Sequence, residues 1–297
     1  MLKKRRFKKK PFLIYSILIL VFIFSVSSCA QRVAEIEKEE TRIEELEKTE
    51  EIEEIEESEE SKEVVKTEEE TKGKEKTGEI TEEKEIPPEG YWEVTFKTDD
   101  SVEIEGRIFG IGENGLILAH MYPADQESWK DFALLLSQKG YRVLTFNFRG
   151  YGKSGGEKKI SLIYKDVLAA YDFFKEEGVE DIILIGASMG GTAVLKAASE
   201  REVKGVISMS GPLNWKEMGL SAEEEIKLIE EPKLFMASEG DSSAKNSANL
   251  MYELSNEPKQ IEIYPGSEHG TNMFLGKEGE QVKQDIISFI EENLSIK

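Results

Sequence analysis

The pattern of hydrophobic and polar positions divides the chain into three parts. An apolar run over 12–26 follows a cluster of seven Lys and Arg residues, and residues 30–88 then consist mostly of Glu, Lys and Thr. From residue 89 onward, apolar positions recur at the spacings of strands and helices. This last part has the length and composition to bury a sizeable core. We therefore expect a single globular domain over 89–297.

Strand and helix patterns alternate along the globular part. Apolar and polar residues alternate on both sides of 98–101, which predicts an antiparallel hairpin. Continuous apolar runs predict buried strands, and apolar residues at helical spacing predict the helices between them. The predicted strands cover 115–119, 142–148, 181–185, 204–209, 233–237 and 260–264. The predicted helices cover 129–140, 163–174, 190–200, 248–254 and 282–294, with a short acidic helical stretch before the strand at 233.

Repeated strand–helix units favour a mostly parallel sheet with helices on both faces. Ligands bind such sheets at the carboxyl ends of the strands. The polar residues that follow the predicted strands are therefore the candidates for chemistry.

The stretch 186–190, Gly-Ala-Ser-Met-Gly, lies between a predicted strand and a predicted helix. It fits G-x-S-x-G, in which small residues let a strand turn sharply into a helix while the Ser hydroxyl is presented above the sheet. The N-terminus of the helix adds partial positive charge nearby. We expect Ser188 to be a nucleophile; a tight turn without catalysis is the alternative.

A serine hydroxyl needs a base, and the chain contains only His120 and His269. His269 lies between the last predicted strand and the last helix, and we expect it to be the base. His120 ends an earlier strand, where a structural role is expected. Asp241 follows the strand at 233–237 and completes the chain order Ser, Asp, His, with Glu239 as its nearest rival for orienting the imidazole.

The oxyanion of a tetrahedral intermediate needs preorganised donors. The backbone N–H of Met189, directly after Ser188, is one candidate. The second should come from the loop after the strand at 115–119, where we expect Tyr122, with Met121 as the alternative.

With these motifs in place, residues 89–297 resemble the α/β-hydrolases, near the dienelactone-hydrolase-like and small serine esterase families. The segment 120–125 resembles the family's His-Gly oxyanion loop, with Met121 in place of the usual Gly. The segment 147–154 resembles its Asp-x-Arg-Gly-x-Gly-x-Ser segment, with Asn147 in place of Asp. The resemblance implies the α/β-hydrolase fold: a mostly parallel central sheet flanked by helices.

The resemblance also implies a serine hydrolase that cleaves carboxylic esters of small molecules through an acyl-enzyme, without a cofactor. Peptidase and thioesterase activities stay open, as does a non-catalytic surface lipoprotein that uses the fold as a binding module. About twenty residues separate Gly211 from Pro232, too few for a large cap. The apolar residues of this insertion are expected either to form the rim of an open site or simply to pack: Trp215, Met218 and Leu220.

The N-terminal 28 residues have the order of a lipoprotein signal peptide: a basic cluster, a short apolar run and small residues before Cys29. We expect Cys29, the only cysteine, to carry a lipid, so that the protein is exported and attached to a membrane at the cell surface or the periplasmic face. An uncleaved signal anchor is the alternative. Residues 29–88 are then an acidic, low-complexity spacer.

Charge and composition exclude several other functions. The formal net charge is −21, and the segment 31–88 alone has 24 acidic and 10 basic residues. Such a chain repels nucleic acid, which we do not expect as a partner. A lone cysteine allows no disulfide within the chain, and no His and Cys cluster has the spacing of a metal site. The stretch Gly152-Lys153-Ser154 lacks the leading Gly of a phosphate-binding loop.

Overall fold

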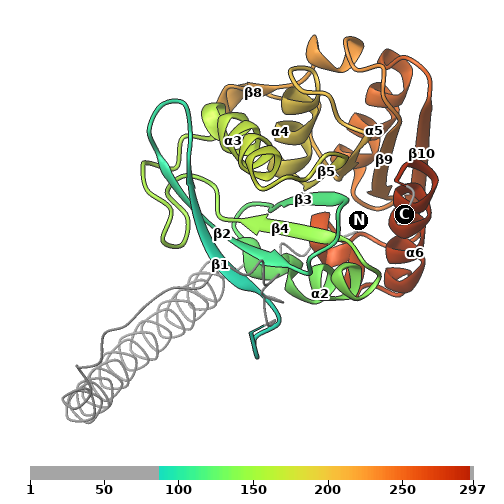
Figure 1. Ribbon diagram of the computed structural model, residues 1–297. Helices are drawn as coiled ribbons and strands as arrows, with labels where there is room; N and C mark the ends of the chain where they lie inside the picture. The colour runs from blue at the N-terminus through green and yellow to red at the C-terminus, as the bar shows by residue number, and fades with distance from the viewer. Residues whose placement is uncertain (1–86, 295–297) are drawn as a thin grey trace, which may run out of the picture. The chain divides into compact units, whose positions relative to one another are not determined.

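A computed structural model describes residues 87–294 (Figure 1). The predicted signal peptide, Cys29 and nearly all of the spacer lie outside these residues. The strands are β1 Trp92–Lys97, β2 Glu103–Phe109, β3 Gly115–Ala119, β4 Arg142–Phe146, β5 Ile182–Ala187, β6 Gly205–Met209, β7 Asn214–Trp215, β8 Leu220–Ser221, β9 Lys233–Ser238 and β10 Lys259–Tyr264. The α-helices are α2 Lys130–Gln138, α3 Ile163–Glu176, α4 Met189–Ala198, α5 Ser242–Leu254 and α6 Gly279–Asn293. Short 3-10 helices lie at Gln126–Trp129, Ile160–Leu162, Lys216–Met218, Glu225–Lys227 and Gly270–Leu275.

Eight strands form one sheet, in the order β1-β2-β4-β3-β5-β6-β9-β10. β1 pairs antiparallel with β2, β2 pairs antiparallel with β4, and all later neighbours are parallel. The register places Ala119, at the end of β3, opposite Gly186 of β5. The loops that follow β3, β5, β6, β9 and β10 therefore share one edge of the sheet.

Helices cover both faces of the sheet (Figure 1). Residues of α3, α4 and α5 pack in one core cluster, and residues of α2 and α6 pack in the other. Along the central strand β5, Leu184 faces the first cluster while Ile183 and Ile185 face the second. Because both faces are covered, β3 and β5 are buried at every position, which explains their continuous apolar runs.

The structure confirms the predicted hairpin and the parallel strands, with boundary shifts of up to two residues. α5 begins at Ser242 and not at residue 248, because the Asp241 side chain caps it by accepting a hydrogen bond from the Ala244 N–H at 3.2 Å. The short acidic helical stretch predicted before β9 corresponds to the 3-10 helix Glu225–Lys227. The residues before it form the β7–β8 hairpin, which was not predicted, with a second 3-10 helix and Gly219 at φ +67° in its turn.

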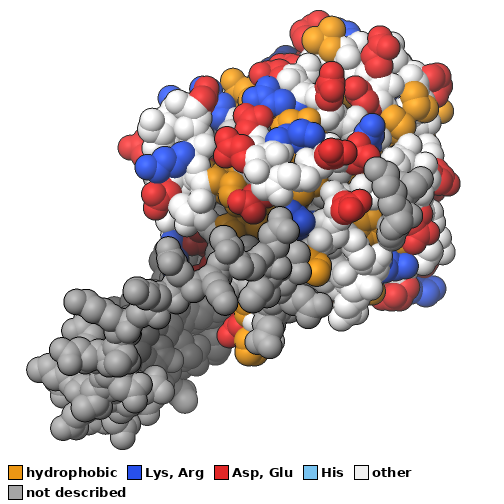
Figure 2. All heavy atoms as spheres, viewed as in Figure 1, with side chains coloured by type: hydrophobic (Ala, Val, Ile, Leu, Met, Phe, Trp, Pro, Cys, Tyr) orange, Lys and Arg blue, Asp and Glu red, His pale blue; other side chains and the backbone are white. Residues whose placement is uncertain are grey.

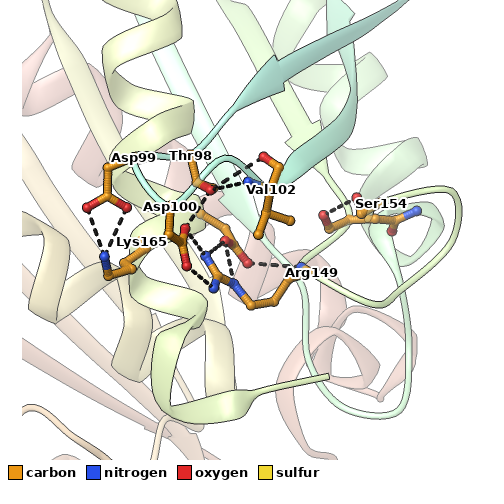
Figure 3. A network of polar contacts seen from close by, with 9 residues as sticks. Thr98, Asp99, Asp100, Val102, Arg149, Ser154 and Lys165 are labelled. Carbon is orange, nitrogen blue, oxygen red and sulfur yellow. Dashed lines mark hydrogen bonds and ion pairs between the residues drawn. The ribbon is translucent and has the colours of Figure 1, made fainter. Parts of the chain in front are cut away.

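A buried charged network fixes the loop that follows β4 (Figure 3). The Arg149 guanidinium donates to Asp166 of α3 at 2.6 and 2.8 Å and to Asp100 of the β1–β2 turn at 2.8 and 3.1 Å. The Arg149 backbone N–H also donates to Asp166, at 2.9 Å. Arg149 and Asp166 are 3 % and 0 % exposed, while Asp100 is 32 % exposed, so a buried ion pair joins the loop to α3 and a partly exposed one joins it to the β1–β2 turn.

Within residues 87–294, no helix has the length and apolar character needed to cross a lipid bilayer.

Candidate active site

Ser188 occupies the sharp turn between β5 and α4. Its backbone angles, φ +51° and ψ −119°, are strained for a residue with a side chain. A Cβ on Gly186 would lie 2.2 Å from the Gly190 carbonyl oxygen, and a Cβ on Gly190 would lie 2.4 Å from the Ala119 carbonyl oxygen. Both glycines are therefore required by close backbone contacts, and the turn has the geometry of a nucleophile elbow.

His269 and Asp241 reach Ser188 from the loops after β10 and β9. The His269 Nε2 atom lies 2.8 Å from the Ser188 Oγ atom, and its Nδ1 atom lies 2.5 Å from an Asp241 carboxylate oxygen. The second Asp241 oxygen accepts the α5 N–H described above, so the carboxylate is held at both ends. With Nδ1–H donating to Asp241, Nε2 is left to accept the serine proton.

Two serine hydroxyls hold the histidine loop on either side of His269. Ser238, the last residue of β9, donates its hydroxyl to the Glu268 carbonyl at 2.7 Å. Ser210, directly after β6, accepts the Gly270 N–H on its hydroxyl oxygen at 3.0 Å. Sequence reasoning missed both residues; the available signal was their position at the carboxyl ends of two neighbouring parallel strands.

The two rival residues are engaged elsewhere. The Glu239 carboxylate pairs with Lys245 at 2.7 Å and is 63 % exposed. His120 is fully buried: its Nε2 atom accepts the Phe148 N–H at 3.1 Å, and its Nδ1 atom lies 2.9 Å from the Met121 carbonyl. Burial lowers the pKa of His120 to about 4, so the ring is neutral near pH 7, with its proton on Nδ1.

This tautomer orients the next peptide group. The Met121 carbonyl points toward His120, and because the Met121–Tyr122 peptide bond is trans, the Tyr122 N–H points in the opposite direction. No hydrogen-bond acceptor for that N–H is present in residues 87–294. The Met189 N–H belongs to the first turn of α4, where backbone donors have no partner within the helix. These two N–H groups are the candidate oxyanion donors.

Asn147 has a structural reason to replace the family's Asp. Its side-chain carbonyl accepts the Gln126 N–H at 2.8 Å, and its NH₂ group donates to the Glu105 carboxylate. An Asp could only accept, and would repel Glu105. Ser154 likewise has a structural role, since its hydroxyl donates to the Asn147 carbonyl at 2.7 Å.

The insertion between β6 and β9 was expected either to form the rim of the site or to pack against the core, and most of its apolar side chains pack. Leu220 is 1 % exposed in the core, and Trp215 packs partly against the same cluster. Met218 is 44 % exposed. Ordinary packing therefore accounts for Leu220 and for most of Trp215, and Met218 is the only one of the three predicted rim residues with a largely open side chain.

Charges on the surface are mixed. Acidic and basic side chains are interspersed over the described part of the face shown in Figure 2, without a continuous basic patch there. No cluster of three or more His, Cys, Asp or Glu residues within 87–294 has the arrangement of a metal site.

Fold and site together describe an α/β protein with a strained serine at the carboxyl edge of a parallel sheet and a histidine–aspartate pair beside it. The family model for the alpha/beta hydrolase fold matches residues 115–230. A carboxylesterase from Bacillus subtilis is 24 % identical over 235 residues, covering 61 % of this chain and 93 % of that protein.

Solved structures show the same architecture. An esterase from Pyrococcus furiosus has a TM-score of 0.61 and 20 % identity, covering 69 % of this chain and 93 % of that one. A monoacylglycerol lipase from Paleococcus ferrophilus has a TM-score of 0.57 and 19 % identity, covering 64 % and 99 %. The chain has the α/β-hydrolase fold, as the sequence resemblance implied.

Proposed function

We propose that the protein is a serine hydrolase that cleaves carboxylic esters of small molecules through an acyl-enzyme. The observation that carries this proposal is the continuous hydrogen-bonded series from Ser188 through His269 to Asp241. The names of the B. subtilis carboxylesterase and of the P. furiosus esterase support an ester as the substrate class.

In the first half of the reaction, the Ser188 oxygen attacks the ester carbonyl carbon while its proton moves to His269 Nε2. Asp241 stabilises the resulting imidazolium. The carbonyl oxygen becomes negative and is stabilised by the N–H groups of Met189 and Tyr122. When the carbon–oxygen bond to the alcohol breaks, His269 returns the proton to the leaving alkoxide, and the acyl group stays on Ser188.

In the second half, water enters the place of the alcohol. His269 takes a proton from the water, the hydroxide attacks the acyl carbon, and the proton then passes to the Ser188 oxygen as the carboxylic acid leaves. His269 is suited to both steps because its side chain is 43 % exposed, so that the alcohol and the water can reach it.

The direct test compares hydrolysis of p-nitrophenyl acetate and butyrate by the wild type and by Ser188→Ala. Removing the nucleophile should lower kcat/KM by at least about 1,000-fold. Ser199→Ala is the matched control, because Ser199 directly follows α4 and its hydroxyl bonds only the Lys196 carbonyl in the described chain. Equal rates for wild type and Ser188→Ala would reject the proposal.

We further propose that the enzyme is exported and attached to a membrane through a lipid on Cys29, with the acidic spacer between anchor and catalytic domain. This proposal stands on the signal-like sequence alone. Cys29→Ala should move the protein from the membrane fraction to the soluble exported fraction, and an unchanged distribution would contradict lipidation.

A further inference from the structure

The Met121 side chain lies against the histidine loop. Gly270, directly after His269, has φ +57°, and a Cβ built there would lie 2.6 Å from the Met121 Sδ atom and 3.4 Å from the Ala187 Cβ atom. Met121 is 7 % exposed. Gly270 follows the proposed base and Ala187 precedes the proposed nucleophile, and both lie beside the Met121 side chain.

A polar contact accompanies this packing. The Thr271 hydroxyl lies 3.6 Å from the Met121 sulfur, to which it donates, and Thr271 is 5 % exposed. A second thioether, Met273, accepts from the Ser210 hydroxyl at 3.5 Å on the same loop. Since Ser210 also accepts the Gly270 N–H, the backbone that follows His269 is held from two directions, by β6 and by the loop after β3.

Met121 is fixed at its backbone as well. Its carbonyl faces the Nδ1 atom of His120, which directs the Tyr122 N–H the other way. One residue therefore contacts the loop of the base with its side chain and sets the direction of an oxyanion donor with its main chain. A glycine, usual at this place in the resembling families, has no side chain to make the first contact.

We propose that Met121 is a positioning residue that holds the oxyanion loop and the His269 loop in register. The proposal rests on the proposed esterase function. Met121 should affect kcat more than KM. It acts through Tyr122 and His269, and both of these stabilise charge that develops in the transition state.

The test measures kcat and KM on p-nitrophenyl butyrate for Met121→Ala, Met121→Leu and Met251→Ala. Met121→Ala should lower kcat by about 10- to 100-fold with KM changed less than about threefold, since small misplacements of catalytic groups cost this much. Met121→Leu keeps the volume and should recover kcat to within about threefold of wild type. Met251, 1 % exposed on α5, controls for the loss of a buried methionine side chain and should leave kcat within about twofold.

A Met121→Ala variant that folds and keeps the wild-type kcat would overturn the proposal, as would an equal loss in Met251→Ala. If circular dichroism shows Met121→Ala unfolded, Thr271→Val decides: a kcat at least about threefold lower supports the positioning role, and an unchanged kcat overturns it. Absence of Ser188-dependent turnover in the wild type would reject the esterase function itself, and the positioning proposal with it. Turnover that Met121 variants leave unchanged would reject the positioning proposal alone.

Discussion

The domain contains two clusters of charged and polar side chains, one around Arg149 and one around Ser188. They differ in how far their side chains are accessible to a substrate. Around Arg149 (Figure 3), the guanidinium and the Asp166 carboxylate are paired in the interior, at 3 % and 0 % exposure, and the Asp100 carboxylate, 32 % exposed, binds the same guanidinium from the surface side. Around Ser188, the His269 side chain is 43 % exposed and the serine backbone is strained. A cluster whose charges are already paired with one another holds segments together, whereas the exposed histidine beside Ser188 can exchange protons with a substrate.

The difference also appears in the protonation chemistry. The hydrogen bond from Arg149 holds the pKa of the Asp100 carboxyl well below its usual range. Burial raises the pKa of the Asp166 carboxyl, and hydrogen bonds from Arg149 oppose that effect. We place Asp166 as ionised at neutral pH, because three N–H groups of Arg149 point at its oxygens. The Arg149 cluster thus keeps its charges fixed, which suits a structural role.

The largest effect should come from the cluster around Ser188. Asp241→Asn should lower kcat by about 1,000- to 10,000-fold, because an amide in this place favours the wrong imidazole tautomer. Glu239→Gln is the matched control: its carboxylate pairs with Lys245 at the surface, so kcat should stay within about twofold. Steady-state hydrolysis of p-nitrophenyl butyrate measures both. Comparable losses in the two variants would undo the assignment of Asp241.

The cluster around Arg149 should respond in stability. Arg149→Met removes the guanidinium from the buried Asp166 carboxylate and leaves it only the backbone N–H of residue 149, which should lower the free energy of unfolding by about 3–5 kcal/mol. Lys165→Met removes the neighbouring ion pair with Asp99, whose side chain is 71 % exposed, and should cost at most about 1 kcal/mol. Denaturant unfolding measures the loss of unfolding free energy in both variants. Similar losses would contradict the claim that the buried ion pair contributes more to stability than the exposed one.

A smaller effect should appear with pH at His120. The folded-state pKa of about 4 lies below the unfolded value near 6.5, so the unfolded chain binds more protons in this range. The stabilising contribution is present above about pH 6.5 and is lost as the pH falls toward 4. Between pH 7 and 4.5, the fall in unfolding free energy should be about 2 kcal/mol smaller in His120→Gln than in wild type. Parallel pH profiles would contradict a neutral, buried His120.

Local features of the site could be predicted from the sequence, while contacts between distant segments could not. The nucleophile elbow is visible because strand, small residues and helix are adjacent in the chain. The contacts of Ser238 with Glu268, of Ser210 with Gly270 and of Met121 with Thr271 join residues 30, 60 and 150 positions apart. Only the strand order of the folded sheet brings those residues to one edge.

The misread elements have local physical causes. The β7–β8 hairpin was not predicted because each of its strands has only two residues, and its turn depends on the positive φ of Gly219. The start of α5 lacks apolar spacing, and its position is set by the Asp241 cap. The same carboxylate thus begins a helix and orients His269, and only the second role could be inferred from chain order.

The central claim is that His269 activates Ser188 for covalent chemistry. Mass spectrometry after treatment with a fluorophosphonate probe tests it most directly, because the probe bonds to an activated serine oxygen. The account predicts one adduct per chain, on Ser188, absent in Ser188→Ala and formed at least about 100-fold more slowly in His269→Ala. A folded wild-type protein that stays unlabelled, or that is labelled equally fast without His269, would contradict it.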